Sequence, residues 1–335
     1  MIDFIKKHWI KLSIVVGAIL IAFSGVAIYL IFGARTTEIA KAPAAPPAVS
    51  PNLPAAQNWT DLYAVSIDNQ VDARPISGVD KAAFVIEAPV EGGISRLLAF
   101  FERGNPVPKI GPVRSARPYF LDWVKDTGPA LFLHIGGSPD ALARIAADPV
   151  LLITDADGIA AAGVYFSRDD SREAPHNAYV ASKDVETIFW KRSQVLRPVA
   201  GWNFLPDPDA SELGNGGDIK LNFGSEKTNF VVWSYDKTNN LYTRAVGGKA
   251  DKTDDNTALT AKNVVLLSTD VSTIDADGRK SVRTTGTGNA KVYENGNEID
   301  GTWKCDGSSL PRFYDTSGNE IVFTAGNVWI EVVSN

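Results

Sequence analysis

Cysteine and histidine are scarce in this chain of 335 residues, which contains one cysteine and three histidines. A single cysteine excludes a disulfide framework and any zinc or iron–sulfur site built from several cysteines. Three histidines leave little room for a metal centre with several histidine ligands. We therefore expect no metal site and no cofactor.

Positive charge is also in the minority, because 33 lysine and arginine residues face 39 aspartate and glutamate residues, for a net charge of -6. Proteins that bind nucleic acid need a basic face, so this balance argues against DNA or RNA as a partner. Hydrophobic residues make up 44% of the chain and aromatic residues 10%. That content is too high for a mainly disordered chain, and the length suffices for two ordinary domains with packed cores.

Common signatures of catalysis are missing as well. The sequence contains no GxSxG nucleophile elbow, no HExxH metal motif, no P-loop and no complete GxGxxG. The lone Cys305 lies in a predicted strand–turn region between Lys304 and Asp306, without the surroundings of a transpeptidase nucleophile. We expect it to be structural.

An uncharged run, Leu12 to Phe32, has the roughly 20 residues that a helix needs to cross a bilayer. Three lysines precede it, so residues 1–11 should be a cytoplasmic stub and the globular part should lie outside the cytoplasmic membrane. The run is longer than the apolar part of a cleavable signal peptide, about 7–15 residues, which favours an uncleaved anchor at residues 12–32. Residues 33–58, rich in alanine and proline, predict a semi-stiff linker.

The composition changes near residue 198. Over residues 59–197, strand-like runs alternate with helix starts such as Ser138-Pro139-Asp140, which predicts an N-terminal α/β domain. Residues 198–217 are rich in Pro, Asp, Asn and Gly and predict an inter-domain linker. Over residues 218–335 helix signals vanish, and strand-like runs broken by turns predict a mostly antiparallel β domain. The expected fold class is therefore α+β, in a membrane-anchored, two-domain protein.

Charged side chains gather beside tight backbone in the central part of the chain. Arg114 and Arg117 lie just before a predicted helix that begins at Pro118. A helix start offers free amide donors and a partial positive charge, and two guanidinium groups there favour a carboxylate or phosphate. His134 to Pro139 forms a second junction of this kind, and we expect Arg172 and His176 to close the same cleft.

Four strings in this region closely resemble the YerB-like lipoprotein family, a domain of unknown function (number 3048) found in bacterial cell-envelope proteins. The resemblance extends to shorter strings on both sides and covers about Tyr63 to Val333. It implies an envelope-facing domain on a membrane tether, although members often carry a lipid on an N-terminal cysteine where this chain has an apolar run. The four strings are EAPVEGG (87–93), GPVRSARP (111–118), HIGGSP (134–139) and SREAPHN (171–177); the shorter ones include IDN (67–69), ARP (73–75), YTR (242–244), GTW (301–303) and WI (329–330).

Three functions follow from these observations. The leading one is a module that binds an anionic ligand, such as a cell-wall fragment or a partner's carboxylate. The alternatives are an envelope hydrolase or transferase with His176 and either Glu87 or Glu91 as acid and base, and a non-catalytic structural partner of a membrane complex. The arginines can equally pair with nearby acids in a structural network. The expected ligand-binding residues are Asp68, Arg74, Arg114, Arg117, His134, Ser138, Arg172 and Asn177.

Overall fold

The computed structural model describes residues 56–59, 61–128, 130–147, 153–159, 164–192, 199–224 and 226–335. The predicted stub (1–11), membrane helix (12–32) and most of the predicted linker 33–58 lie outside the described residues. Within the described ranges, no helix is long and apolar enough to cross a membrane. Residues Pro54–Asn335 form one compact unit.

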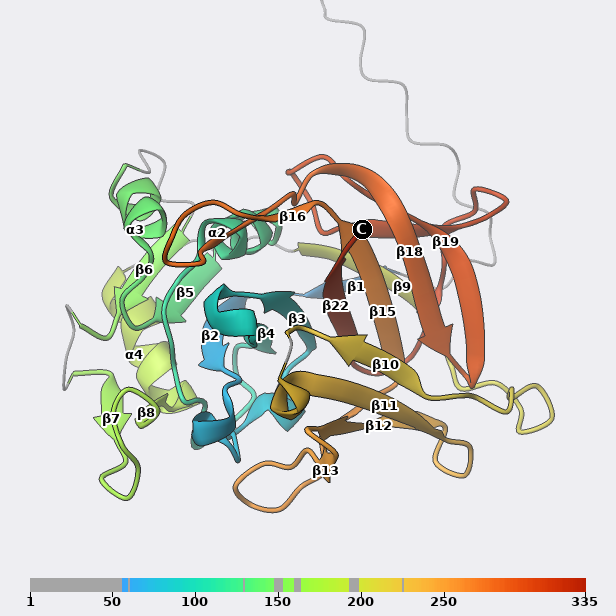
Figure 1. Cartoon of the computed structure of the whole chain (residues 1–335), viewed down its shortest axis with the longest axis horizontal. Coiled ribbons are helices and arrows are strands. Elements are labelled where there is room, and N and C mark those ends of the chain that lie inside the picture. The colour runs from blue at the N-terminus through green and yellow to red at the C-terminus, as the bar shows by residue number, and fades with distance from the viewer. Residues whose placement is uncertain are drawn as a thin grey trace, which may run out of the picture. The chain divides into compact units, whose positions relative to one another are not determined.

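A ten-stranded mixed sheet runs through the centre of this unit (Figure 1). It is mostly antiparallel at one end and parallel at the other. Its strands, in spatial order, are β20 (Arg312–Asp315), β19 (Asn297–Cys305), β18 (Gly286–Glu294), β15 (Asn263–Thr269), β22 (Val328–Ser334), β3 (Phe84–Pro89), β4 (Ser95–Glu102), β2 (Leu62–Asp68), β5 (Ala130–His134) and β6 (Ile153–Asp157).

The middle of this sheet joins the two halves of the chain. The last strand, β22, pairs in parallel with β3 from the N-terminal half, and Glu331 lies opposite Glu87. The segments 59–197 and 218–335 therefore both contribute strands to one sheet and belong to one compact unit. Composition along the chain could not reveal this, because the strands that pair are more than 200 residues apart in the sequence.

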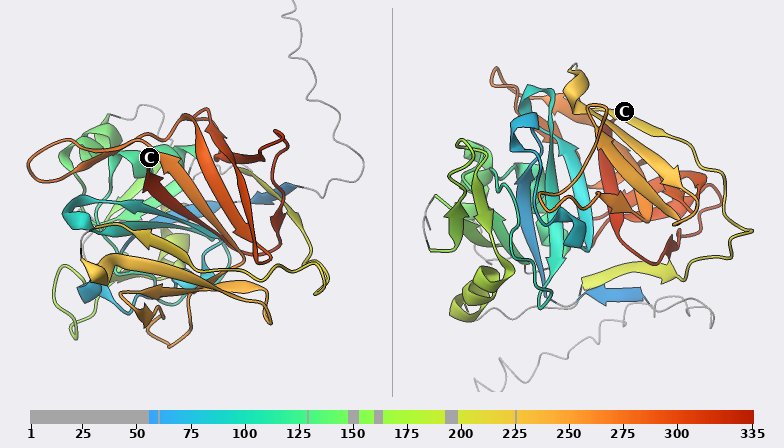
Figure 2. Two further views of the ribbon diagram at one scale, coloured as in Figure 1. Left: turned by 45° about the vertical axis from the view of Figure 1, so that its right-hand side comes forward. Right: turned by 90° about the horizontal axis from the view of Figure 1, so that it is seen from below.

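The predicted linker 198–217 begins with a strand, β9 (Val199–Leu205), which pairs with β1 (Ala56–Trp59) and β21 (Phe323–Thr324) in a small sheet (Figure 2, right). Trp202 in β9 is almost fully buried and packs edge-on against Trp59 and Phe323. The composition of this segment predicted a linker. Val199 and Trp202 are nevertheless buried in the core, and this burial explains why a strand forms here.

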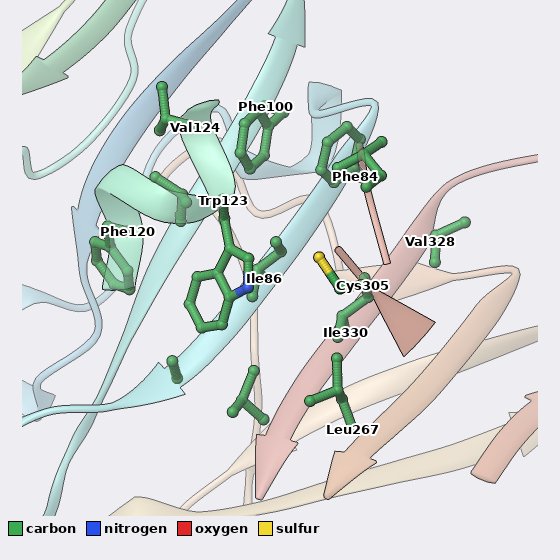
Figure 3. Close-up of a cluster of buried hydrophobic side chains, with 14 of the residues drawn as sticks. Phe84, Ile86, Phe100, Phe120, Trp123, Val124, Leu267, Cys305, Val328 and Ile330 are labelled. Atoms are coloured by element: carbon green, nitrogen blue, oxygen red, sulfur yellow. The ribbon is translucent and has the colours of Figure 1, made fainter. Parts of the chain in front are cut away.

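One face of the large sheet is covered by α2 (Pro118–Asp126) and α3 (Pro139–Ala146). Figure 3 shows Trp123 of α2 beside Ile86 of β3, in a core that also includes Ile330 of β22. Both helices begin at their predicted prolines, and Ser138 caps α3 by accepting a hydrogen bond from the amide of Ala141.

The opposite face packs against α4 (Ser182–Arg192) and a second sheet. That sheet contains β10 (Ile219–Asn222), β11 (Phe230–Asp236), β12 (Leu241–Val246), β13 (Lys249–Ala250) and β14 (Thr260–Ala261). Two hairpins complete the fold: β7 (Phe166–Arg168) with β8 (Ala178–Val180), and β16 (Val271–Thr273) with β17 (Lys280–Val282). The structure is mostly β, and the described α-helices all lie between residues 118 and 192.

Several strands of the large sheet point in the same direction. β2, β5 and β6 are mutually parallel, and β2 and β3 both run antiparallel to β4. Their carboxyl ends therefore meet at one edge of the sheet, which is where α/β proteins commonly hold ligands. Asp68, at the end of β2, and His134, at the end of β5, both lie at this edge.

Candidate functional site

A closed ring of five polar side chains lies between the large sheet and the β10–β14 sheet. Arg244 donates two hydrogen bonds to Glu87, at 2.6 and 2.8 Å, and forms an ion pair with Asp251. Asp251 also pairs with Arg74, which donates to Asn69. Asn69 closes the ring by donating to Glu87 at 2.9 Å. We call these residues the charge ring.

The charge ring is supplied by both halves of the chain. Glu87 lies on β3 and Asn69 directly follows β2, whereas Arg244 lies on β12 and Asp251 directly follows β13. The side chains of Glu87 and Arg244 have no exposed surface, and 15% of the Arg74 side chain is exposed. The charge ring therefore extends from the buried Glu87 and Arg244 to the partly exposed Arg74.

The electrostatics of the charge ring involve one further carboxyl group. Glu331 lies opposite Glu87 on β22 and is fully buried. Burial, together with the charge of Glu87, raises the pKa of Glu331 well above its usual value. Burial alone would lower the pKa of Arg244, but the charges of Glu87 and Asp251 outweigh it and raise that pKa. The charge ring itself contains two carboxyl groups, Glu87 and Asp251, and two guanidinium groups, Arg74 and Arg244.

Asp68 is the centre of a second cluster, next to the charge ring in sequence and in space. Its carboxylate lies 2.9 Å from Nε of Arg114 and 2.7 Å from Nδ1 of His176, and it accepts a hydrogen bond from the amide of Gln70. Because Nδ1 of His176 contacts Asp68, Nε2 is the ring nitrogen that remains for a ligand.

A surface pocket opens beside these two clusters, with a volume of about 460 Å³. Its wall contains Arg74, Arg172 and His176 together with two acids, Asp72 and Glu173. We call it the His176 pocket. Arg172 donates to the carbonyl oxygens of Ala73 and Pro75, both at 2.7 Å. It makes no ion pair with any described residue.

Other predicted site residues form contacts that hold the fold together. Nε of Arg117 lies 3.0 Å from Glu91, and another of its nitrogens donates to the carbonyl of Ala116. Only 6% of the Arg117 side chain is exposed, and burial lowers its pKa. Within the part of the chain that the structure describes, neither Glu87 nor Glu91 makes a hydrogen bond or ion pair with His176. The expected pairing of His176 with a glutamate is replaced by its contact with Asp68.

His134, Ser138 and Asn177 are not part of the His176 pocket wall. His134 is fully buried, with Nδ1 lying 2.8 Å from the carbonyl oxygen of Gly136, and Ser138 caps α3. Asn177 accepts a hydrogen bond from Arg168 and donates one to the carbonyl of Arg172, so it supports the loop that carries His176.

Three members of the charge ring, Asn69, Arg244 and Asp251, were not among the predicted site residues. Asn69 and Arg244 lie within the family-like strings IDN and YTR, and those strings were the available signal. Ser95, which donates to Glu87 at 2.5 Å, and Asp251 carry no such signal. Ser95 meets Glu87 across the neighbouring strands β3 and β4, whereas Asp251 meets Arg74 only where distant parts of the chain pack together.

The matched sequence defines a class of proteins whose function is unknown. A model of the N-terminal domain of the DUF3048 family, described as proteins of unknown function, matches residues 51–194, and a model of the family's C-terminal domain matches residues 219–330. The chain belongs to this family, as the strings had indicated.

The similar proteins include YerB of Bacillus subtilis (strain 168), whose name marks it as a candidate lipoprotein. It is 31% identical over 276 residues, which cover 81% of this chain and 80% of YerB. A crystal structure of YerB from Bacillus subtilis has a TM-score of 0.71 at 27% identity, and the match covers 82% of this chain and 91% of that one.

Proposed function

We propose that this protein is tethered to the cytoplasmic membrane and exposes its globular part to the cell envelope. The relationship to a candidate lipoprotein and the apolar run at residues 12–32 support this proposal. Protease added to bacterial spheroplasts that produce the full chain should digest the globular part. Complete protection of the globular part, with digestion only after lysis, would contradict the orientation.

We further propose that the His176 pocket binds an anionic ligand. The observation that carries this proposal is Arg172, a cation in the pocket wall without a carboxylate partner among the described residues. Arg74 is held in the same wall by the charge ring, so part of the positive surface is positioned before a ligand arrives. Asp72 and Glu173 limit the net charge of the pocket, which favours a small anion over a strongly charged polymer.

The test is isothermal titration of the full chain in detergent micelles with inorganic phosphate and with acetate. Arg172→Gln should weaken binding about 10–100-fold, because a hydrogen bond to a charged group contributes roughly 1.5–3 kcal/mol. Arg144→Gln is the matched control, since Arg144 is a partly exposed arginine on α3 that pairs with Asp122 outside the pocket. Absence of binding at millimolar concentrations, or equal loss in both variants, would contradict the proposal.

A second candidate function is acid–base catalysis at the same pocket. The contact of 2.7 Å between Asp68 and Nδ1 of His176 favours it, because a carboxylate in this position orients an imidazole for proton transfer through Nε2. The acidic partner is then Asp68 rather than a glutamate. With cell-wall fragments as substrate, His176→Ala should reduce turnover about 100-fold or more and leave phosphate binding within a few-fold of the unmodified protein. Unchanged turnover in His176→Ala would exclude this mechanism.

A further inference from the structure

A second surface pocket, with a volume of about 340 Å³, shares Arg74 with the His176 pocket. Four apolar residues, Val71, Pro75, Val246 and Ala250, line it. Its wall also contains two lysines, Lys249 and Lys252. We call it the Val246 pocket.

The apolar part of the Val246 pocket is open to solvent. Val71, for example, is 52% exposed. Apolar side chains that line a concave surface beside a few polar groups are typical of small-molecule sites, which have volumes of about 300–1,000 Å³. This pocket is at the lower end of that range, so it suits a short apolar group.

The β12–β13 hairpin places apolar and basic side chains together. Its turn, Gly247-Gly248, has φ values of 60° and 76°, which glycine adopts without strain. Val246 and Lys249 are paired across the turn. Directly paired residues of antiparallel strands project from the same face, so both side chains reach the pocket.

The two lysines at this pocket make no ion pair with a carboxylate of the described residues. Lys249 makes no ion pair within the described ranges, and Lys252 donates to the side-chain oxygen of Asn256 at 2.9 Å. Asp251 also lines the pocket, but it already pairs with both Arg74 and Arg244. The pocket therefore combines an apolar surface with a cationic rim.

We propose that the Val246 pocket is a subsite for a short apolar group carried by the anionic ligand, an inference that rests on the proposed function of the His176 pocket. Arg74 belongs to both walls, and the charge ring holds it in place through Asn69 and Asp251. A ligand whose anionic group lies at Arg172 thus reaches the apolar wall by passing Arg74. The ligand class is a small organic anion, a phosphate or carboxylate with a short apolar substituent.

The test compares monoalkyl phosphates from methyl to hexyl in titrations of the full chain in detergent micelles. Burial of each added methylene should raise affinity about fourfold until the pocket is full. Ala250→Phe fills the pocket, and Val246→Thr keeps the shape of the wall while making it polar. Both should reduce the gain per methylene and leave the affinity for inorganic phosphate unchanged. Val164→Thr, at an exposed valine outside both pockets, is the control and should retain the full gain.

Each outcome separates the subsite from the anion site. Equal affinity for methyl and hexyl phosphate, or a gain that survives Ala250→Phe, overturns the subsite even if inorganic phosphate binds through Arg172. If inorganic phosphate does not bind but hexyl phosphate binds and depends on Val246, the subsite stands and the His176 pocket fails as the anion site. If neither ligand binds, both proposals fail.

Discussion

Arg244→Met is the most direct test of the charge ring, because it removes one buried cation and leaves a side chain of similar length. In the unmodified protein, Arg244 donates two hydrogen bonds to Glu87 and pairs with Asp251. The variant therefore leaves two buried carboxyl groups without their shared partner. Methionine can still pack between Trp233 and Trp329, whose ring centroids lie 5.8 and 5.1 Å from the guanidinium carbon of Arg244.

The expected cost is about 3–5 kcal/mol in the free energy of unfolding, the usual penalty for breaking a buried ion pair by removal of one partner. We expect the upper part of this range, because two carboxylates lose a partner at once. This is a large share of the roughly 5–15 kcal/mol that stabilises an ordinary domain. The double variant Glu87→Gln with Arg244→Met should be about 1–2 kcal/mol more stable than Arg244→Met alone, because one stranded charge is gone.

Urea unfolding followed by tryptophan fluorescence measures these differences, since two tryptophans flank Arg244. Arg283→Met is the matched control: Arg283 also pairs with an aspartate, Asp270, and lies over a tryptophan ring, but a third of its side chain is exposed. It should cost about 1 kcal/mol or less. The reasoning is refuted if Arg244→Met costs no more than the control, or if adding Glu87→Gln destabilises it further.

Three further predictions concern other buried groups. Burial raises the pKa of Asp126 to about 7, whereas an aspartate in an unfolded chain has a pKa of about 3.9. The folded state therefore binds more protons than the unfolded state between about pH 4 and 7, and stability falls as the pH rises through this window. Asp126→Asn should remove this loss of stability. At pH 8, but not at pH 4, the variant should be about 2 kcal/mol more stable than the unmodified protein, as measured by urea midpoints. Parallel pH profiles of stability for the two proteins would contradict this. Burial raises the pKa of Cys305 to about 12, so the thiol should react with Ellman's reagent only after unfolding, and Cys305→Ser should leave phosphate binding unchanged; rapid labelling of the folded protein would mean that the thiol is accessible. Arg117→Ala should lower the unfolding free energy by about 2–3 kcal/mol by leaving Glu91 without its partner, while phosphate affinity stays the same; a selective loss of binding in a stable protein would return Arg117 to the site.

The local elements were the most predictable part of the fold. Pro118 and Ser138-Pro139-Asp140 predicted the starts of α2 and α3, and both helices begin there. These signals are local, because a cap residue or a proline acts on the backbone within one helical turn. The strand β9 was missed, since Trp202 contributes through contacts with Trp59 and Phe323 that lie far away in the sequence.

The candidate site was predicted only in part, for a related reason. His176, Asp68 and Arg114 do converge, and Arg74 and Arg172 join His176 in one pocket. Arg117 was expected at the same cleft because it also precedes a helix, but its side chain turns to Glu91. Proximity to a helix start does not specify which neighbour a long side chain will contact.

By itself, the sequence determined the family, the helix starts, the predominance of strands after residue 198, and the residue types available for an anion site. Each depends on neighbours within a few residues or on strings that can be read directly. The tertiary structure alone decided that both halves share one sheet, that Arg244 meets Glu87, and that Arg74 lines two pockets. The physical reason is that packing of the two sheets brings together groups more than 150 residues apart, and a buried charge finds its partner only after that packing is complete.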